Sequence, residues 1–159
     1  MVGALEALYP VLARGMGHWS GHYTHLAPDG TPIDRHRVDT FSAFPGDGGG
    51  DFLLRIWNRW DDGRDSRIDL RADHNGDALA PRLLWRERLV GAMWEVGDTS
   101  VYLDFHYAAD PALRVCEMIQ IAPDGQTRAR TWHWFRDERL IKITLTHEWR
   151  TPPGEQVLA

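Results

Sequence analysis

Cysteine is nearly absent from this chain, and that absence limits the chemistry the chain can carry. Cys116 is the only cysteine among the 159 residues. A single thiol cannot form an intrachain disulfide, a CxxC redox pair or a zinc knuckle. The first sixteen residues include Glu6 and Pro10 and no early basic cluster, so we expect no signal peptide. We therefore expect a cytoplasmic protein.

A long apolar run and an excess of positive charge are also missing. No segment approaches the roughly 18 consecutive apolar residues that a membrane span requires. Lys and Arg together number 18 against 23 Asp and Glu, which gives a formal net charge of -5. Because nucleic-acid binding needs concentrated basic charge, we expect neither nucleic acid nor membrane as a partner.

The short motifs that bind common cofactors are absent as well. The sequence contains no GxSxG, no Walker loop, no Rossmann fingerprint and no HExxH. We therefore predict that no cofactor takes part in any reaction of this protein.

Tryptophan and histidine, in contrast, are abundant, with eight of each. An aromatic-rich core is the commoner use of such residues, but they also suit a chamber with flat apolar walls and a few titratable groups. The length of 159 residues, with 43% apolar and 26% charged residues, indicates one globular domain.

Hydrophobic periodicity predicts a short helix followed by a long β-meander. Leu5, Leu8 and Leu12 recur at spacings of three and four, which is typical of a helix over residues 3–14. After Gly17 the period becomes two. Ten extended runs follow, at residues 18–26, 33–44, 51–60, 64–72, 78–86, 88–96, 99–107, 113–122, 126–136 and 139–150.

Such a series of strands can stack as a sandwich or close as a barrel, and closure removes the exposed sheet edges. We predict an all-β fold, an antiparallel up-and-down β-barrel of eight to ten strands over residues 17–150. A barrel of this size encloses a chamber for one small ligand. The Pro- and Gly-rich tail at residues 151–159 is expected to be frayed.

Turn sequences set the expected register of the hairpins. Residues 27–30 and 122–125 both read APDG, which places Gly where a type I turn with a bulge needs a positive φ. Direct pairing across the hairpins puts Ile56 opposite Ile68 and His22 opposite His36, both pairs on the inner face. Tyr23 and Trp19 would then point outward, and Tyr23 or Trp57 could belong to a homodimer face.

The last hairpin carries the most tryptophan, and its faces follow from a tight turn at residues 137–138. We take the Trp-rich face as the interior, and a single bulge would invert this assignment. The residues expected on that face are Arg128, Arg130, Trp132, Trp134, Ile141, Ile143, Leu145, His147 and Trp149.

Several of these segments resemble a known family. Gly17-His18-Trp19 and Arg150 resemble the lipocalin and calycin pattern, in which the Trp lies at the closed end of the barrel and the late Arg packs across its ring. The runs GHWSGHYTHLAPDG, NRWDDGR, CEMIQIAPDG, RARTWHWFR and TLTHEWR resemble a poorly characterised family of bacterial and cyanobacterial lipocalin-like proteins.

The resemblance covers most of residues 17–150. It implies the barrel and a small-molecule pocket, but no reaction. The residues that match the recurring pattern of the family are Asn58, Trp60, Glu117, Arg128, Arg130, Trp132, Trp134, Glu148 and Arg150.

A cross-strand pair of His22 and His36 is the first candidate for chemistry. Cβ atoms paired across strands lie roughly 4.5–5.5 Å apart, and one ring could act as a general base near neutral pH. A metal would need a third ligand, which no sequence spacing supplies, so we predict no metal site. Ordinary, partly buried histidines are the alternative.

Arg128 and Arg130 are the second candidates. Two guanidiniums inside a barrel need anionic partners, because an unpaired buried charge is too costly. Glu117, Glu148 or Asp104 could supply an internal ion-pair network, and a ligand carboxylate or phenolate is the alternative. The remaining residues expected to bind the ligand are Asn58, Trp60, Tyr107, Trp132, Trp134 and His147.

Three functions fit these expectations. The first is a cofactor-independent lyase, isomerase, cyclase or decarboxylase acting on a small hydrophobic, aromatic or polyketide-like molecule, with His22, His36 and Arg130 as the catalytic residues. The second is a carrier that binds such a molecule without changing it. The third is a haem-binding barrel of the nitrobindin type, which needs one cavity histidine able to ligate iron.

Overall fold

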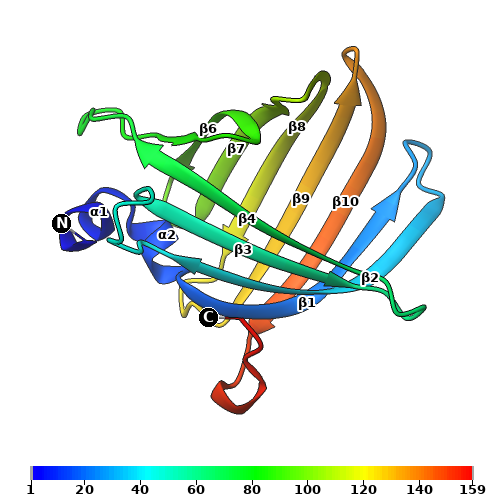
Figure 1. Cartoon of the computed structure of the whole chain (residues 1–159), viewed down its shortest axis with the longest axis horizontal. Helices are drawn as coiled ribbons and strands as arrows, with labels where there is room; N and C mark the ends of the chain where they lie inside the picture. Colours follow the sequence, from blue (N-terminus) through cyan, green and yellow to red (C-terminus); the bar gives the residue numbers. More distant parts are fainter. Residues whose placement is uncertain (1, 159) are drawn as a thin grey trace.

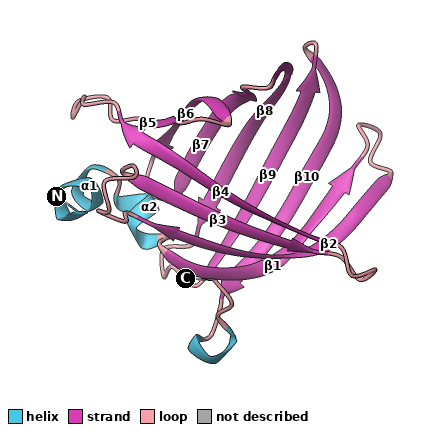
Figure 2. Ribbon diagram, viewed as in Figure 1, coloured by secondary structure: helices cyan, strands magenta, loops and turns pink. Residues whose placement is uncertain are grey.

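A computed structural model describes residues 2–158 and has the form of a closed antiparallel β-barrel (Figure 1). The strand order around the barrel is β1-β10-β9-β8-β7-β6-β5-β4-β3-β2, so the first and last strands are neighbours. Within residues 2–158 most of the chain is in strands, and the helices lie near the two ends of this range (Figure 2). The predicted up-and-down barrel is confirmed.

The strands have the following bounds: β1 (Gly17–Leu26), β2 (Pro32–Ala43), β3 (Phe52–Arg59), β4 (Asp65–His74), β5 (Leu83–Trp85), β6 (Leu89–Val96), β7 (Ser100–Tyr107), β8 (Asp110–Ile121), β9 (Thr127–Arg136) and β10 (Arg139–Arg150). A 3₁₀ turn, η1 (Pro153–Glu155), follows the last strand. The strand expected at residues 78–86 is shortened to β5, because Asn75 and Asp77 accept hydrogen bonds from nearby backbone N–H groups and form a loop.

Two helices, α1 (Val2–Leu8) and α2 (Pro10–Arg14), stand where a single helix was predicted. Pro10 has no N–H to donate to an earlier carbonyl, so it begins a new helix instead of continuing the first. The helices lie at one end of the barrel, with the β1–β2 and β9–β10 turns at the other (Figure 1). Val11 and Leu12 are buried in the core there. No helix within residues 2–158 has the length and apolar composition to cross a membrane.

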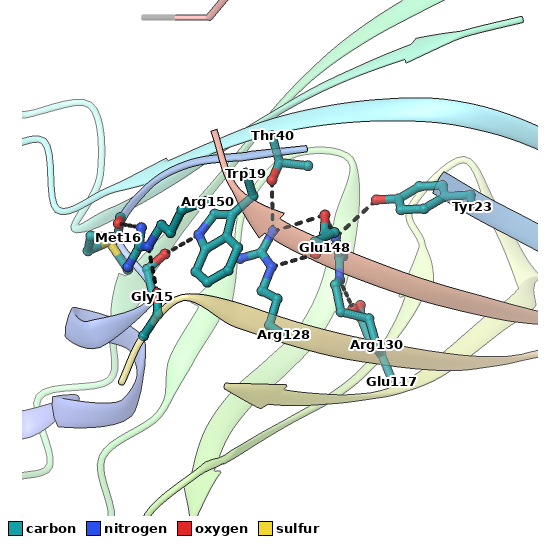
Figure 3. Close-up of polar contacts among 11 residues, drawn as sticks. Gly15, Met16, Trp19, Tyr23, Thr40, Glu117, Arg128, Arg130, Glu148 and Arg150 are labelled. Atoms are coloured by element: carbon teal, nitrogen blue, oxygen red, sulfur yellow. Dashed lines mark hydrogen bonds and ion pairs between the residues drawn. The ribbon is translucent and has the colours of Figure 1, made fainter. Parts of the chain in front are cut away.

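Trp19 and Arg150 close the same end. Trp19 is fully buried, and its Nε1 donates to the carbonyl of Gly15 at 2.8 Å. The guanidinium of Arg150 lies 4.2 Å from the Trp19 ring centre and donates to the carbonyls of Met16 and Gly125. The contact expected from the lipocalin resemblance is therefore present (Figure 3). A cation over an indole face contributes about 0.5–2 kcal/mol.

The β3–β4 hairpin has the predicted register. Ile56 pairs with Ile68, and Asn58 pairs with Ser66. The opposite, outer face carries Trp57, with the guanidinium of Arg67 4.1 Å from its ring centre.

The β1–β2 hairpin differs from the prediction because it contains a β-bulge. Leu26 pairs with Pro32 but His25 pairs with Asp34, so Ile33 is an extra residue. One extra residue exchanges the two faces of β1. The predicted pairing of His22 with His36 is therefore wrong, because Tyr23 lies opposite His36. The expected outward orientation of Tyr23 and Trp19 is also wrong, because both side chains are buried.

A second bulge inverts β10. Leu140 pairs with Phe135 and Lys142 with Trp134, which leaves Ile141 as the extra residue. The Trp-rich face of β9 is the interior, as predicted, but the face of β10 assigned to the interior is wrong. The residues of β10 that face inward are Lys142, Thr144, Thr146 and Glu148, while Ile143, Leu145, His147 and Trp149 face outward.

Candidate functional site

A cavity of about 650 Å³ lies inside the barrel, on the side away from the helices. Its wall is mainly aliphatic and aromatic, with contributions from Leu54, Ile56, Ile68, Leu70, Trp85, Leu89, Leu103, Phe105, Trp132 and Trp134. Polar and charged residues of the lining are Tyr23, His25, His36, Asn58, Glu87, Arg88, Tyr107, Glu117, Arg130 and Lys142. A cavity of this size suits one small molecule.

Most of the predicted site residues line this cavity: His36, Asn58, Trp60, Tyr107, Glu117, Arg130, Trp132 and Trp134. Arg128 lies deeper, toward the closed end. The expected inward orientation of His22 and His147 is wrong, because the bulges at Ile33 and Ile141 place both rings on the outer face, where they pair across β1 and β10.

The same bulges bring three further side chains into the cavity, namely Tyr23, His25 and Lys142. A signal in the sequence could have found the two on β1. The lipocalin-like GxW motif requires Trp19 to be buried, and strand alternation from Trp19 then directs Tyr23 and His25 inward.

Arg128 and Glu148 form a buried ion pair beyond the cavity, toward the closed end of the barrel (Figure 3). Arg128 donates from Nε to Glu148 Oε2 at 2.5 Å and from Nη2 to Glu148 Oε1 at 3.2 Å, and its Nη2 also donates to Thr40 at 2.7 Å. Gly21 pairs with Glu148, and a Cβ on Gly21 would lie 2.3 Å from the backbone oxygen of His147 and 2.8 Å from the Glu148 Cγ. The close approach of the β10 backbone and of Glu148 to β1 therefore requires glycine at this position.

Arg130 extends the network to the cavity wall. Its Nε donates to Glu117 Oε1 at 2.7 Å, and its Nη1 donates to the Tyr23 hydroxyl at 3.0 Å and lies 3.7 Å from Glu148 Oε1. Two arginines and two glutamates thus balance each other, which is the internal ion-pair alternative considered from the sequence. Burial raises the pKa of Glu148, but Arg128 and Arg130 outweigh this effect and hold that pKa below its usual range.

A second polar cluster lies near the open end, around His36. The Nδ1 of His36 is 2.7 Å from Asp34 Oδ2, and its Nε2 is 3.1 Å from Asn58 Oδ1. Trp60 donates from Nε1 to both carboxylate oxygens of Asp34, at 3.0 and 3.2 Å. Burial raises the pKa of Asp34, but the hydrogen bonds from His36 and Trp60 outweigh it and lower that pKa. Asp34 is therefore an ionised partner that holds the His36 ring.

His25 lies beside this pair, with its ring centre 5.3 Å from that of His36. Its Nδ1 is 2.7 Å from the Thr144 hydroxyl, which also accepts a hydrogen bond from Trp134 Nε1 at 2.9 Å. Burial, together with the charge of Lys142, lowers the pKa of His25 to about 4. At neutral pH this ring is uncharged.

The fold is shared with solved structures of low sequence identity. A protein of unknown function of the DUF3598 family from Nostoc punctiforme is 15% identical, with a TM-score of 0.66 over 88% of this chain. The S-type phycobiliprotein lyase CPES from Guillardia theta is 13% identical, with a TM-score of 0.66 over 94% of this chain and 93% of its own. Rv2717c from M. tuberculosis is 13% identical, with a TM-score of 0.61 over 91% of this chain and 98% of its own.

These similarities concern the fold, a lipocalin-like β-barrel, and confirm the fold that the sequence resemblance implied. This chain spans about half of the DUF3598 protein, at 49% of its length. No family model matches the sequence, and no curated protein matches it.

Proposed function

We propose that the barrel binds a small, flat, largely apolar molecule in its cavity and that His36, held by Asp34, performs acid/base chemistry on it without a cofactor. The observation that supports this proposal is the cavity of about 650 Å³, whose apolar wall is interrupted by a few converging polar groups. A dry chamber with fixed polar groups strengthens each polar interaction that a ligand makes.

In this proposal His36 exchanges a proton with the ligand. Its ring lines the cavity, and the hydrogen bond from Nδ1 to Asp34 fixes the orientation of the imidazole. The nitrogen that exchanges the proton is Nε2, which the ligand reaches by displacing the 3.1 Å contact with Asn58 Oδ1. The Trp60 ring packs against the His36 ring at a tilt of 31°, with 4.2 Å between ring centres, and Trp60 also donates to Asp34. Asp34 and Trp60 are thus positioning residues for His36.

Arg130 and Tyr23 orient an oxygen of the ligand. Glu117 fixes the guanidinium of Arg130, which in turn donates to the Tyr23 hydroxyl. Burial raises the pKa of Tyr23, so its hydroxyl stays protonated and can donate to a phenolate or carboxylate. Trp132 packs edge-on against Tyr23, at 5.0 Å between ring centres, and supplies a flat wall.

Lyase, isomerase, cyclase and decarboxylase reactions fit this arrangement, since each can proceed by proton transfer without an external oxidant or reductant. One structural neighbour is named a phycobiliprotein lyase. That name supports a lyase-type reaction and a pigment-like ligand in a barrel of this fold.

The test is to identify the small molecule that co-purifies with the protein by mass spectrometry and then to measure its turnover. His36→Gln should lower kcat by about a hundredfold or more and leave Kd nearly unchanged. His22→Gln, on the outer face of β1, is the matched control and should retain full activity. No turnover by the wild type, with binding retained, would identify a carrier instead. A Soret band after haem addition would indicate the haem-binding alternative.

A further inference from the structure

We infer that His25, Asp34 and His36 form a binding site for a divalent transition metal at the mouth of the cavity. One possible ligand atom from each of the three residues lies within 4.8 Å of the other two. The site joins the end of β1 to the start of β2, and the bulge at Ile33 is what sets His25 opposite Asp34. This inference goes beyond the proposed function, which requires no metal.

The hydrogen bonds of His36 show where a cation fits. Asn58 donates from Nδ2 to Ser66 at 3.1 Å, and it therefore presents its acceptor Oδ1 to His36 Nε2. His36 Nδ1 and Asp34 Oδ2 face each other at 2.7 Å, so together they form one edge of the metal site. In the metal-free protein a proton occupies the space between these two atoms, and a bound metal ion takes its place.

Each of the three residues is also held from outside, as metal ligands usually are. Thr144 holds His25 Nδ1, and Trp134 in turn donates to Thr144. His25 Nε2 has no hydrogen-bond partner among residues 2–158, so it is available as a ligand atom. Asp34 is held in the same way by a hydrogen bond from Trp60, and His36 is held by its contact with Asn58.

Two imidazoles and one carboxylate are a donor set that Zn²⁺ binds, with a fourth position open to water or to the cavity ligand. Tetrahedral bonds of about 2.0–2.1 Å put donor atoms about 3.4 Å apart. The Nδ1 of His36 and the Oδ2 of Asp34, which lie 2.7 Å apart, therefore need to move apart by small rotations, and the His25 ring needs to adjust to the same spacing. The Asp34 side chain is 32% exposed, which gives the ion an entry path. Zn²⁺ would displace the proton between His36 and Asp34, so bound metal and free acid/base His36 are alternative states.

The test is titration of the metal-free protein with Zn²⁺ by calorimetry and with Co²⁺ by visible absorption. We expect one ion per chain, with Co²⁺ bands of a four-coordinate site. His25→Gln and Asp34→Asn should each weaken binding by more than about tenfold. Both side chains are partly exposed, so circular dichroism should show an intact barrel in each variant.

His22→Gln is the control for adventitious binding, because His22 lies on the outer face three residues from His25. It should bind Zn²⁺ as tightly as the wild type. The inference is overturned if the wild type binds no Zn²⁺, or if His25→Gln binds it with unchanged affinity. Neither result depends on turnover or on a ligand, so the proposed function is tested separately.

Discussion

Glu148 balances the interior charges, because it faces both buried arginines. Its side chain is fully buried, and it lies 2.5 Å from Arg128 and 3.7 Å from Arg130. Glu148→Gln keeps the size of the side chain but leaves Arg128 as an uncompensated buried charge. Breaking one partner of a buried pair costs about 3–5 kcal/mol. We expect the free energy of unfolding to fall by that amount in urea denaturation.

The control for this variant is Asp104→Asn, which breaks an ion pair on the outer face. Arg114 and Asp104 lie 2.7 Å apart, but both side chains are about 40% exposed. Pairs in water contribute about 0–1 kcal/mol. An equal loss of stability in Asp104→Asn and Glu148→Gln would contradict the importance given to the buried network.

The lowered pKa of Glu148 also predicts how its contribution depends on pH. A carboxylate whose pKa is lower in the folded than in the unfolded protein stabilises the fold above the unfolded value, about 4.3, and loses that effect as pH falls through the folded value. The difference in unfolding free energy between wild type and Glu148→Gln should therefore be constant near neutral pH and shrink below about pH 4. Denaturation curves of both proteins across this range measure the difference, and a gap that widens in acid would exclude this account.

At the scale of the strand, two single residues decide which side chains reach the cavity. The faces of β2, β3, β4 and β9 follow from alternation and turn chemistry, as the sequence predicts. The faces of β1 and β10 do not, because Ile33 and Ile141 are bulge residues without a local signature. An isoleucine is an ordinary strand residue, so only a long-range constraint, such as the burial of Trp19, reveals the shift.

The assignment of faces on β10 can be tested with neighbouring residues. Leu145 is 43% exposed, whereas Thr146 is buried and pairs with Arg130. Leu145→Lys should change the free energy of unfolding by less than about 0.5 kcal/mol. Thr146→Lys places a second cation beside Arg130 in the interior and should cost more than about 3 kcal/mol. If Leu145→Lys destabilises the protein more than Thr146→Lys in chemical denaturation, the inward face of β10 is the one expected from its apolar pattern.

For the whole molecule, the closure of the sheet into a barrel was predictable from the sequence, but the residues that meet at the mouth of the cavity were not. Ten short runs with polar and apolar faces imply a barrel, and the GxW motif with Arg150 indicates its closed end. The cluster of His25, Asp34 and His36 also depends on Thr144 and Trp134, which are distant in sequence. The β1–β2 hairpin brings the three residues together only because of the bulge at Ile33, and Thr144 reaches His25 only when β1 closes on β10, so spacing along the chain could not predict the cluster.

Closure also predicts that the cavity is the single place where a flat apolar anion binds and stabilises the fold. The fluorescent probe 8-anilinonaphthalene-1-sulfonate should raise the thermal midpoint, since a ligand at about one hundred times its Kd adds about 2.7 kcal/mol. Ile68 lines the cavity and is only partly buried, so Ile68→Trp should fill the space, fold normally and lose this stabilisation. Leu145→Trp, on the outer face, should keep it. If the probe stabilises Ile68→Trp as much as the wild type, the probe binds outside the barrel. That result would contradict the proposal that the cavity is the ligand-binding site.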